Sequence, residues 1–329
     1  MIVGALSLHV YGVTRGLLAS RWPRILLAAM VVLLPALAWE SMNNATNLQW
    51  SLILPCFLAL IAVPVSRSET IASAAVAAVA AATVPTILLM VPLAAVRLAR
   101  RTSPSAGVVA SAFLVGAGAQ VLMVILAARD PFGAASEPLD LPGLYGLGWP
   151  ARSEWVLPTA WRGLGPAFGY GMLVVAASLV SLAIVRRPDR RSTIGLAAGS
   201  SVALFCFPVL VRGTSLLTPV GEHLDLSIGS KWVIGPILLL TLALFMGFEP
   251  REPRGWPRSS AAVVVALALV IAIALLRGFR VENARSNGPR WSAEIAAARG
   301  RCRGGGSNAS IPIPPSGWEV EVPCARLGG

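Results

Sequence analysis

The sequence predicts an all-α polytopic membrane protein with about nine transmembrane helices and a small α/β tail at its C-terminus. Hydrophobic residues make up 56% and charged residues 13% of the 329 residues, and the mean hydropathy is +0.72. Globular proteins are, on average, about one quarter charged. Apolar runs of roughly 17 to 25 residues, the length that spans a bilayer, recur to about Leu276, and arginines cluster in the short connections between them.

We therefore divide the chain into a transmembrane helical bundle, residues 1–276, and an extracytoplasmic C-terminal module, residues 277–329. Within the bundle, three longer polar intervals are expected to be outer loops, at residues 40–50, 128–166 and 212–230.

The formal net charge of +12 would usually indicate a nucleic-acid partner. We expect none, because basic residues in short loops follow the positive-inside rule for membrane proteins. Arg21 and Arg24 precede the apolar run 25–39, and Arg67 follows the run 50–66. The connection between these runs is therefore expected outside. Nine crossings counted from Arg21 place the C-terminus outside a bacterial plasma membrane.

Two segments allow more than one interpretation. Residues 2–18 have a polar stripe that suits either an interfacial helix or a span packed against partners. The Ala-rich stretch 71–96 is broken by Pro85 and Pro92. We expect two short helices that meet near residues 83–86, with one long tilted helix as the alternative.

The tail contains two cysteines in a polar setting, Cys302 and Cys324, whereas Cys56 and Cys206 fall inside apolar runs. A pair of this kind is compatible with a disulfide in an oxidising compartment, which is the compartment expected for the tail.

The tail also has the pattern of a small folded module. It predicts a short helix at 289–298 that begins at a proline, a loop at 304–307, and a strand in which Trp318, Val320 and Val322 alternate with glutamates. A Cys302–Cys324 bridge would join helix to strand. The alternative is a loosely ordered basic tail with unpaired thiols.

The connection 40–50 is the strongest candidate site. Besides a carboxylate it carries side-chain amides that can bind hydroxyls, and an aromatic ring: Glu40, Asn44, Asn47, Gln49 and Trp50. The alternative is a solvated hairpin between two membrane helices.

Further charged residues fall in or next to the other outer loops. Arg129, Asp130 and Arg162 lie in an aromatic-rich interval typical of an interfacial segment, where a lipid-linked substrate would lie. Lys231 and Trp232 begin the next inward run. The alternative for each charge is an interfacial side chain that reaches toward water.

Three motifs together resemble the membrane region of GT-C-type glycosyltransferases, in particular actinobacterial members that look like polyprenyl-phosphate-sugar-dependent enzymes. They are Glu40 to Asn44 followed by Asn47-Leu48-Gln49-Trp50; Ser230-Lys231-Trp232 with Pro236; and, in the tail, Asn283 to Trp291 before Cys302 and Pro314 to Trp318 before Cys324.

The resemblance covers most of the chain, with one departure. Such enzymes typically carry a catalytic acid in their first extracytoplasmic loop, and this chain has no acidic residue before Glu40. We therefore expect that it lacks the first spans of the family.

The resemblance implies sugar transfer from a polyprenyl-phosphate donor to a cell-envelope acceptor. A carboxylate would act as general base, and cations would hold the phosphate. The implied base is Glu40 or Asp130, the implied phosphate ligands are Arg129, Arg162 and Lys231, and the other implied substrate contacts are Asn44, Asn47, Gln49, Trp50 and Trp232.

Two other classes of function stay open. One is a non-catalytic membrane subunit or scaffold of envelope assembly. The other is a transporter or flippase, which is less favoured because such proteins place ionisable groups near the midplane, where Gln120 is the one strongly polar side chain expected. The sequence indicates no cofactor and no spaced Cys/His metal set. It leaves open a divalent metal and the oligomeric state.

Overall fold

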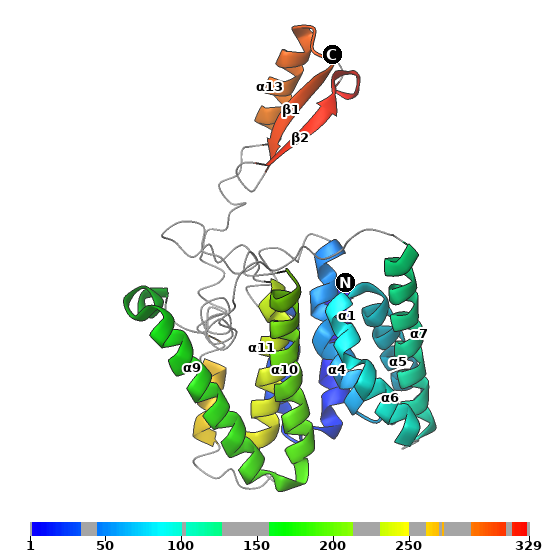
Figure 1. Ribbon diagram of the computed structural model, residues 1–329, viewed down its shortest axis with the longest axis vertical. Coiled ribbons are helices and arrows are strands. Elements are labelled where there is room, and N and C mark those ends of the chain that lie inside the picture. The colour runs from blue at the N-terminus through cyan, green and yellow to red at the C-terminus, as the bar shows by residue number, and fades with distance from the viewer. Residues whose placement is uncertain are drawn as a thin grey trace. The chain divides into compact units, whose positions relative to one another are not determined.

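The computed structural model describes residues 2–33, 45–100, 103–126, 158–212, 231–249, 261–269, 272, 291–313 and 318–327. The chain forms two compact units, residues 1–279 and residues 280–329. The first unit is a helical bundle and the second is a small α/β module (Figure 1). A mostly helical chain with a small sheet is thus confirmed.

The bundle consists of α-helices joined by short 3₁₀ segments, all within residues 2–272. Its elements are α1 (Ile2–Val13), η1 (Thr14–Gly16), α2 (Arg21–Leu33), η2 (Ala45–Leu52), α4 (Ile53–Ile61), α5 (Arg67–Thr83), η3 (Pro85–Met90), α6 (Val91–Arg100), α7 (Pro104–Leu126), α9 (Pro158–Arg186), η4 (Pro188–Arg190), α10 (Arg191–Arg212) and α11 (Lys231–Phe248). Residues 261–269 are also helical.

Local sequence signals set several of these boundaries. Ser66 caps α5, because its hydroxyl accepts a hydrogen bond from the backbone N–H of Glu69 at 3.2 Å, as in a capping box. The same helix ends at Thr83, immediately before Val84 and Pro85, since a residue before proline disfavours the helical conformation. The chain then bends by 119° into the next helix. The expected pair of helices that meet near residue 84 is therefore confirmed, and the alternative of one long tilted helix is not.

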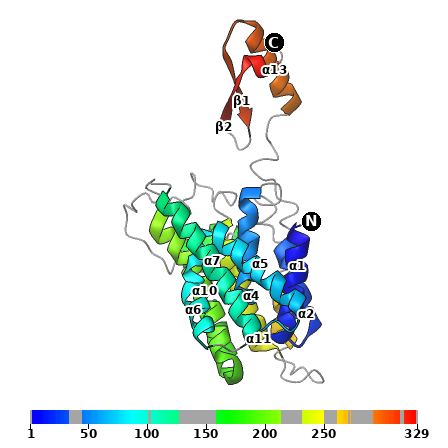
Figure 2. The ribbon, with the colours of Figure 1, turned by 90° about the vertical axis from the view of Figure 1, so that its right-hand side faces the viewer.

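Helix α11 is the central helix of the bundle. Every residue from Ile234 to Glu249 is buried, because α11 packs against α9, α10, α2 and α4 (Figures 1 and 2). A helix that is apolar on all sides requires such a position. At two glycines its neighbours come especially close. A Cβ at Gly235 would lie 2.8 Å from the Ile53 side chain, and one at Gly247 would lie 2.1 Å from the Ala183 Cβ.

By length and composition, the described ranges contain one helix, α7, that could cross a membrane by itself. The bent pair α5 and η3–α6 would supply a second span if it is counted as one. Shorter apolar helices occur at 49–61, 173–186 and 234–248, below the roughly 17 to 25 residues that a span needs. The structure thus supports one or two spans by this criterion, and a larger number is a proposal taken up below.

The second unit packs one helix on a two-stranded antiparallel sheet. Its elements are α13 (Trp291–Arg303), β1 (Asn308–Ile313), β2 (Trp318–Pro323) and η6 (Cys324–Arg326). The register pairs Ala309 with Val322 and Ile311 with Val320, and Ala298 and Leu327 complete the small core. The sequence predicted the helix and β2 but missed β1, because Pro312 is unfavourable in a strand unless the strand lies at an edge. In a two-stranded sheet both strands are edges.

The contact between α5 and α7 yields a stability prediction. A Cβ at Gly116 would lie 2.3 Å from the Ala78 carbonyl oxygen, whereas Gly118 on the same helix faces open space. We expect Gly116→Ala to lower the free energy of unfolding by about 1–3 kcal/mol. Gly118→Ala should raise it by about 0.5–1 kcal/mol, because alanine favours helix. Thermal unfolding of the purified protein in detergent, followed by circular dichroism, would measure both. Equal midpoints for the two variants would contradict the close contact.

Candidate functional site

Several helix ends and connections meet at one end of the bundle, which we call the basic end. It contains η1 and the start of α2, the α4–α5 connection, the end of α6, the α9–α10 connection and the end of α11. Hydrogen bonds and ion pairs join these segments to one another. Its described arginines are Arg15, Arg21, Arg24, Arg67, Arg97, Arg100, Arg186, Arg187, Arg190 and Arg191, and its described carboxylates are Glu69, Asp189 and Glu249.

Glu249 is the most deeply buried carboxylate of this end, with a side chain that is 1% exposed. Its Oε1 accepts a hydrogen bond from the backbone N–H of Ser20 at 2.6 Å, and its Oε2 pairs with Arg190 Nη1 at 3.2 Å. Arg190 also donates to the carbonyl oxygen of Leu17. A single side chain thus ties the end of α11 to the start of α2 and to the α9–α10 connection. The sequence analysis missed it, since Ser20 and Glu249 are 229 positions apart.

Arg187, at the α9–α10 connection, makes further contacts around Glu249, and we call these residues together the Glu249 cluster. Arg187 Nη1 donates to the carbonyl oxygen of Glu249 at 2.9 Å, and its other nitrogens bind both carboxylate oxygens of Asp189, at 3.1 and 2.9 Å. The hydrogen bond from Arg187 is the main reason that the pKa of Asp189 is lowered to about 2. Because the folded pKa lies below the ordinary value of about 3.9, the pair stabilises the fold above about pH 4 and loses this contribution as the pH falls toward 2. The contribution is small, since the Asp189 side chain is 52% exposed.

Two further arginines, Arg97 and Arg15, join other helix ends of the basic end. Arg97 is buried and donates to the carbonyl oxygens of Ala59, at 2.8 Å, and of Ala62, which are at the end of α4. Arg15 pairs with Glu69 at 2.8 Å. Four of the arginines of the basic end, Arg15, Arg97, Arg187 and Arg190, therefore hold helix ends together.

The opposite end of the bundle, which we call the far end, brings two of the sequence motifs together. Segment η2 packs against α11, and Gly235, in the second turn of α11, is in close contact with Ile53, just after η2. The segment that carries Asn47, Gln49 and Trp50 therefore neighbours the helix that begins at Lys231. Trp50 is buried and Gln49 is half-buried.

The other predicted site residues fall in three groups. Glu40, Asn44, Arg129 and Asp130 lie outside the described residues. Asn47, Arg162, Lys231 and Trp232 have a described backbone, in η2, α9 and α11, but their side chains lie outside the described part. Gln49 and Trp50 alone have described side chains, so the geometry between base and phosphate ligands stays a prediction.

Pro236 changes the backbone of α11 close to these residues. It has no N–H, so it donates no helical hydrogen bond to the carbonyl of residue 232. The Ser201 hydroxyl donates to the Pro236 carbonyl at 2.7 Å and fixes α10 against this turn. The helical hydrogen bond that a residue 236 N–H would make is therefore absent near the far end of α11.

The predicted disulfide of the tail is confirmed. Cys302 at the end of α13 and Cys324 after β2 are bonded, with their Cα atoms 5.4 Å apart. The bridge joins helix to sheet, as expected. Cys56 and Cys206 are free.

Comparisons with protein-family models, with curated proteins and with solved structures found no match. In the described ranges, no three His, Cys, Asp or Glu side chains lie close enough to hold a metal ion.

Glu249 allows a direct test of the basic end. Both of its oxygens accept hydrogen bonds, whereas a glutamine amide has one acceptor, so Glu249→Gln leaves one donor without a partner. We expect a loss of about 1–3 kcal/mol in the free energy of unfolding. Asp189→Asn, which changes an exposed partner in the same cluster, should cost less than about 0.5 kcal/mol. Thermal or denaturant unfolding in detergent would compare them, and a larger loss in Asp189→Asn would contradict the assigned role of Glu249.

Proposed function

We propose that the chain is a multi-pass protein of a bacterial plasma membrane, with its basic end in the cytoplasm and its far end outside. The contrast in charge between the two ends supports this orientation. In the sequence, the segments 34–44, 127–157 and 213–230 lie between helices whose described ends are at the far end. Together they contain seven Asp or Glu residues and two Arg residues. The connections of the basic end are dominated by arginine instead, as the positive-inside rule requires of cytoplasmic loops.

Exposed apolar side chains of the bundle support the same proposal. Val121 to Leu126 are six consecutive residues of α7 and are all exposed. Six residues make more than one helical turn, so the exposed apolar surface extends around the whole helix. Val115 and Val185 are 73% and 76% exposed. Contiguous apolar surface of this kind is unfavourable in water and favourable against lipid. We therefore retain nine crossings, in which short helices such as α4 span with the help of their neighbours.

We further propose that the far end transfers a sugar from a polyprenyl-phosphate donor to a cell-envelope acceptor. The observation that carries this is the packing of η2 against α11. It brings the segment that carries the amides into contact with α11, the helix that begins with Lys231 and Trp232, although the two are distant in the sequence. Glu40 precedes η2 by five residues in the sequence.

The chemistry would be a displacement at the anomeric carbon of the donor sugar. The acceptor hydroxyl attacks that carbon and gives its proton to Glu40 or, alternatively, to Asp130. The bond between the sugar and the lipid phosphate breaks, and the polyprenyl phosphate leaves with its negative charge held by Lys231, Arg129 and Arg162. Side-chain amides of the 44–49 segment would bind the sugar hydroxyls.

The orientation can be tested with reporter fusions. Alkaline phosphatase, which folds in an active form outside the cytoplasm, should be active when it is fused after Gly329 and inactive when it is fused after Asp189. A green fluorescent protein should give the reverse pattern. Phosphatase activity at position 189 would contradict the assignment of the basic end to the cytoplasm.

The proposed reaction can be tested in membranes that contain the protein. Radiolabel from polyprenyl-phosphate sugars should move into an acceptor, and Glu40→Gln should lower the rate by about 10² or more, because the general base is lost. Glu137→Gln removes a carboxylate from another far-end segment and should retain the wild-type rate. The amounts of protein in the membrane must be equal. Absence of transfer by the wild type would support a non-catalytic subunit instead.

A further inference from the structure

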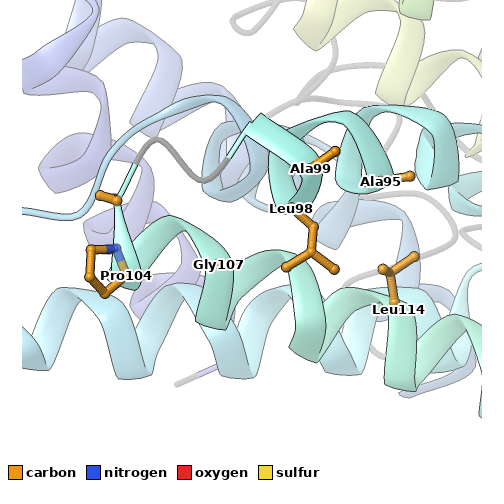
Figure 3. Close-up of a pocket in the computed structure, with 7 residues that line it drawn as sticks. Ala95, Leu98, Ala99, Pro104, Gly107 and Leu114 are labelled. Atoms are coloured by element: carbon orange, nitrogen blue, oxygen red, sulfur yellow. The ribbon is translucent and has the colours of Figure 1, made fainter.

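A groove of about 780 Å³ lies between α6 and α7 (Figure 3). Leu98 and Leu114 line its sides, and the small residues Ala95, Ala99 and Gly107 create the space between the two helices. Ser103 contributes the one hydroxyl of the lining. The volume is in the range of roughly 300–1,000 Å³ that is typical of sites for small ligands.

Each wall of the groove is fixed by a contact on its other side. Arg97, on α6, is held by the backbone at the end of α4. Gly116, on α7, allows α7 to lie directly against the Ala78 backbone of α5. A rotation of either helix to close the groove would disturb one of these contacts.

The surroundings of the groove favour a ligand with an apolar chain and an anionic head. Its lining is almost entirely aliphatic. Next to it, at the basic end, α6 finishes at Arg100, which is exposed and has no acidic partner among the described residues. Arg101 follows in the sequence. Basic residues near a membrane surface attract anionic lipids by about 1 kcal/mol each.

We propose that this groove binds an acyl chain of an anionic phospholipid from the leaflet at the basic end, with the phosphate near Arg100. The proposal rests on the membrane location proposed above. It is independent of sugar transfer, since that reaction is assigned to the far end. The groove is therefore a second, distinct lipid site.

Two glycines of α7 give a matched test. A Cβ at either Gly107 or Gly118 would meet nothing within 4 Å, but Gly107 alone lines the groove. Gly107→Phe should fill the groove, and Gly118→Phe should leave it open. The full chain would be purified in detergent and titrated with phosphatidylglycerol or phosphatidylcholine while its unfolding midpoint is measured.

We expect saturating phosphatidylglycerol to raise the midpoint of the wild type and of Gly118→Phe by about 5 °C. It should raise that of Gly107→Phe by much less. Phosphatidylcholine should have a smaller effect on the wild type, and Arg100→Gln should remove the difference between the two lipids. Native mass spectrometry provides a second measurement, in which Gly107→Phe should lose a bound phosphatidylglycerol that Gly118→Phe keeps.

Three outcomes would overturn the proposal. The first is an equal phosphatidylglycerol shift in Gly107→Phe and Gly118→Phe, and the second is an equal response of the wild type to both lipids. The third is release of the chain from membranes by alkaline carbonate, which would also overturn the membrane location. An integral protein whose lipid response does not depend on Gly107 would overturn the groove proposal alone.

Discussion

The complete burial of α11 is the constraint on which the bundle depends. A helix enclosed along fifteen consecutive residues, Ile234–Phe248, leaves its neighbours little freedom, because they must be close enough to exclude both water and lipid. Two glycines of α11 allow this approach near its two ends. The last turn would leave carbonyl groups without partners, and Arg187 donates to one carbonyl at this end, that of Glu249. The Glu249 side chain joins the same end to the start of α2 and to the α9–α10 connection. The segments that bury α11 therefore also supply the hydrogen-bond partners at its C-terminal end.

Composition and periodicity were sufficient to predict a helical bundle, the break before Pro85 and the bridge between Cys302 and Cys324. The first two predictions rest on patterns that are local in the sequence. The third rests on the oxidising compartment that was expected for the two cysteines. The Glu249 cluster could not be predicted in this way, because its members come from three separate connections and no local pattern marks Glu249 among the acidic residues. The packing of η2 on α11 is likewise a long-range contact, which a resemblance of motifs can suggest but which spacing in the sequence cannot.

The described contacts of the two ends of the bundle differ. At the basic end, hydrogen bonds and ion pairs of Arg15, Arg97, Arg187 and Arg190 join helix ends to one another. The described contacts at the far end include close packing: η2 packs against α11, Gly235 is in close contact with Ile53, and Trp50 is buried.

Three arginines of the basic end bind backbone carbonyls as well as carboxylates or helix ends: Arg97 reaches Ala59 and Ala62, Arg187 reaches Glu249, and Arg190 reaches Leu17. These carbonyls lie at or near the C-terminal ends of helices, where the helix dipole is negative. A guanidinium has five donors in a fixed plane and can serve two acceptors at once, whereas a lysine ammonium is a mobile point charge. The orientation proposed above would require only positive charge, which lysine would supply equally well. At Arg97, Arg187 and Arg190, arginine adds the fork that ties helix ends together, and a lysine at these positions would not provide it.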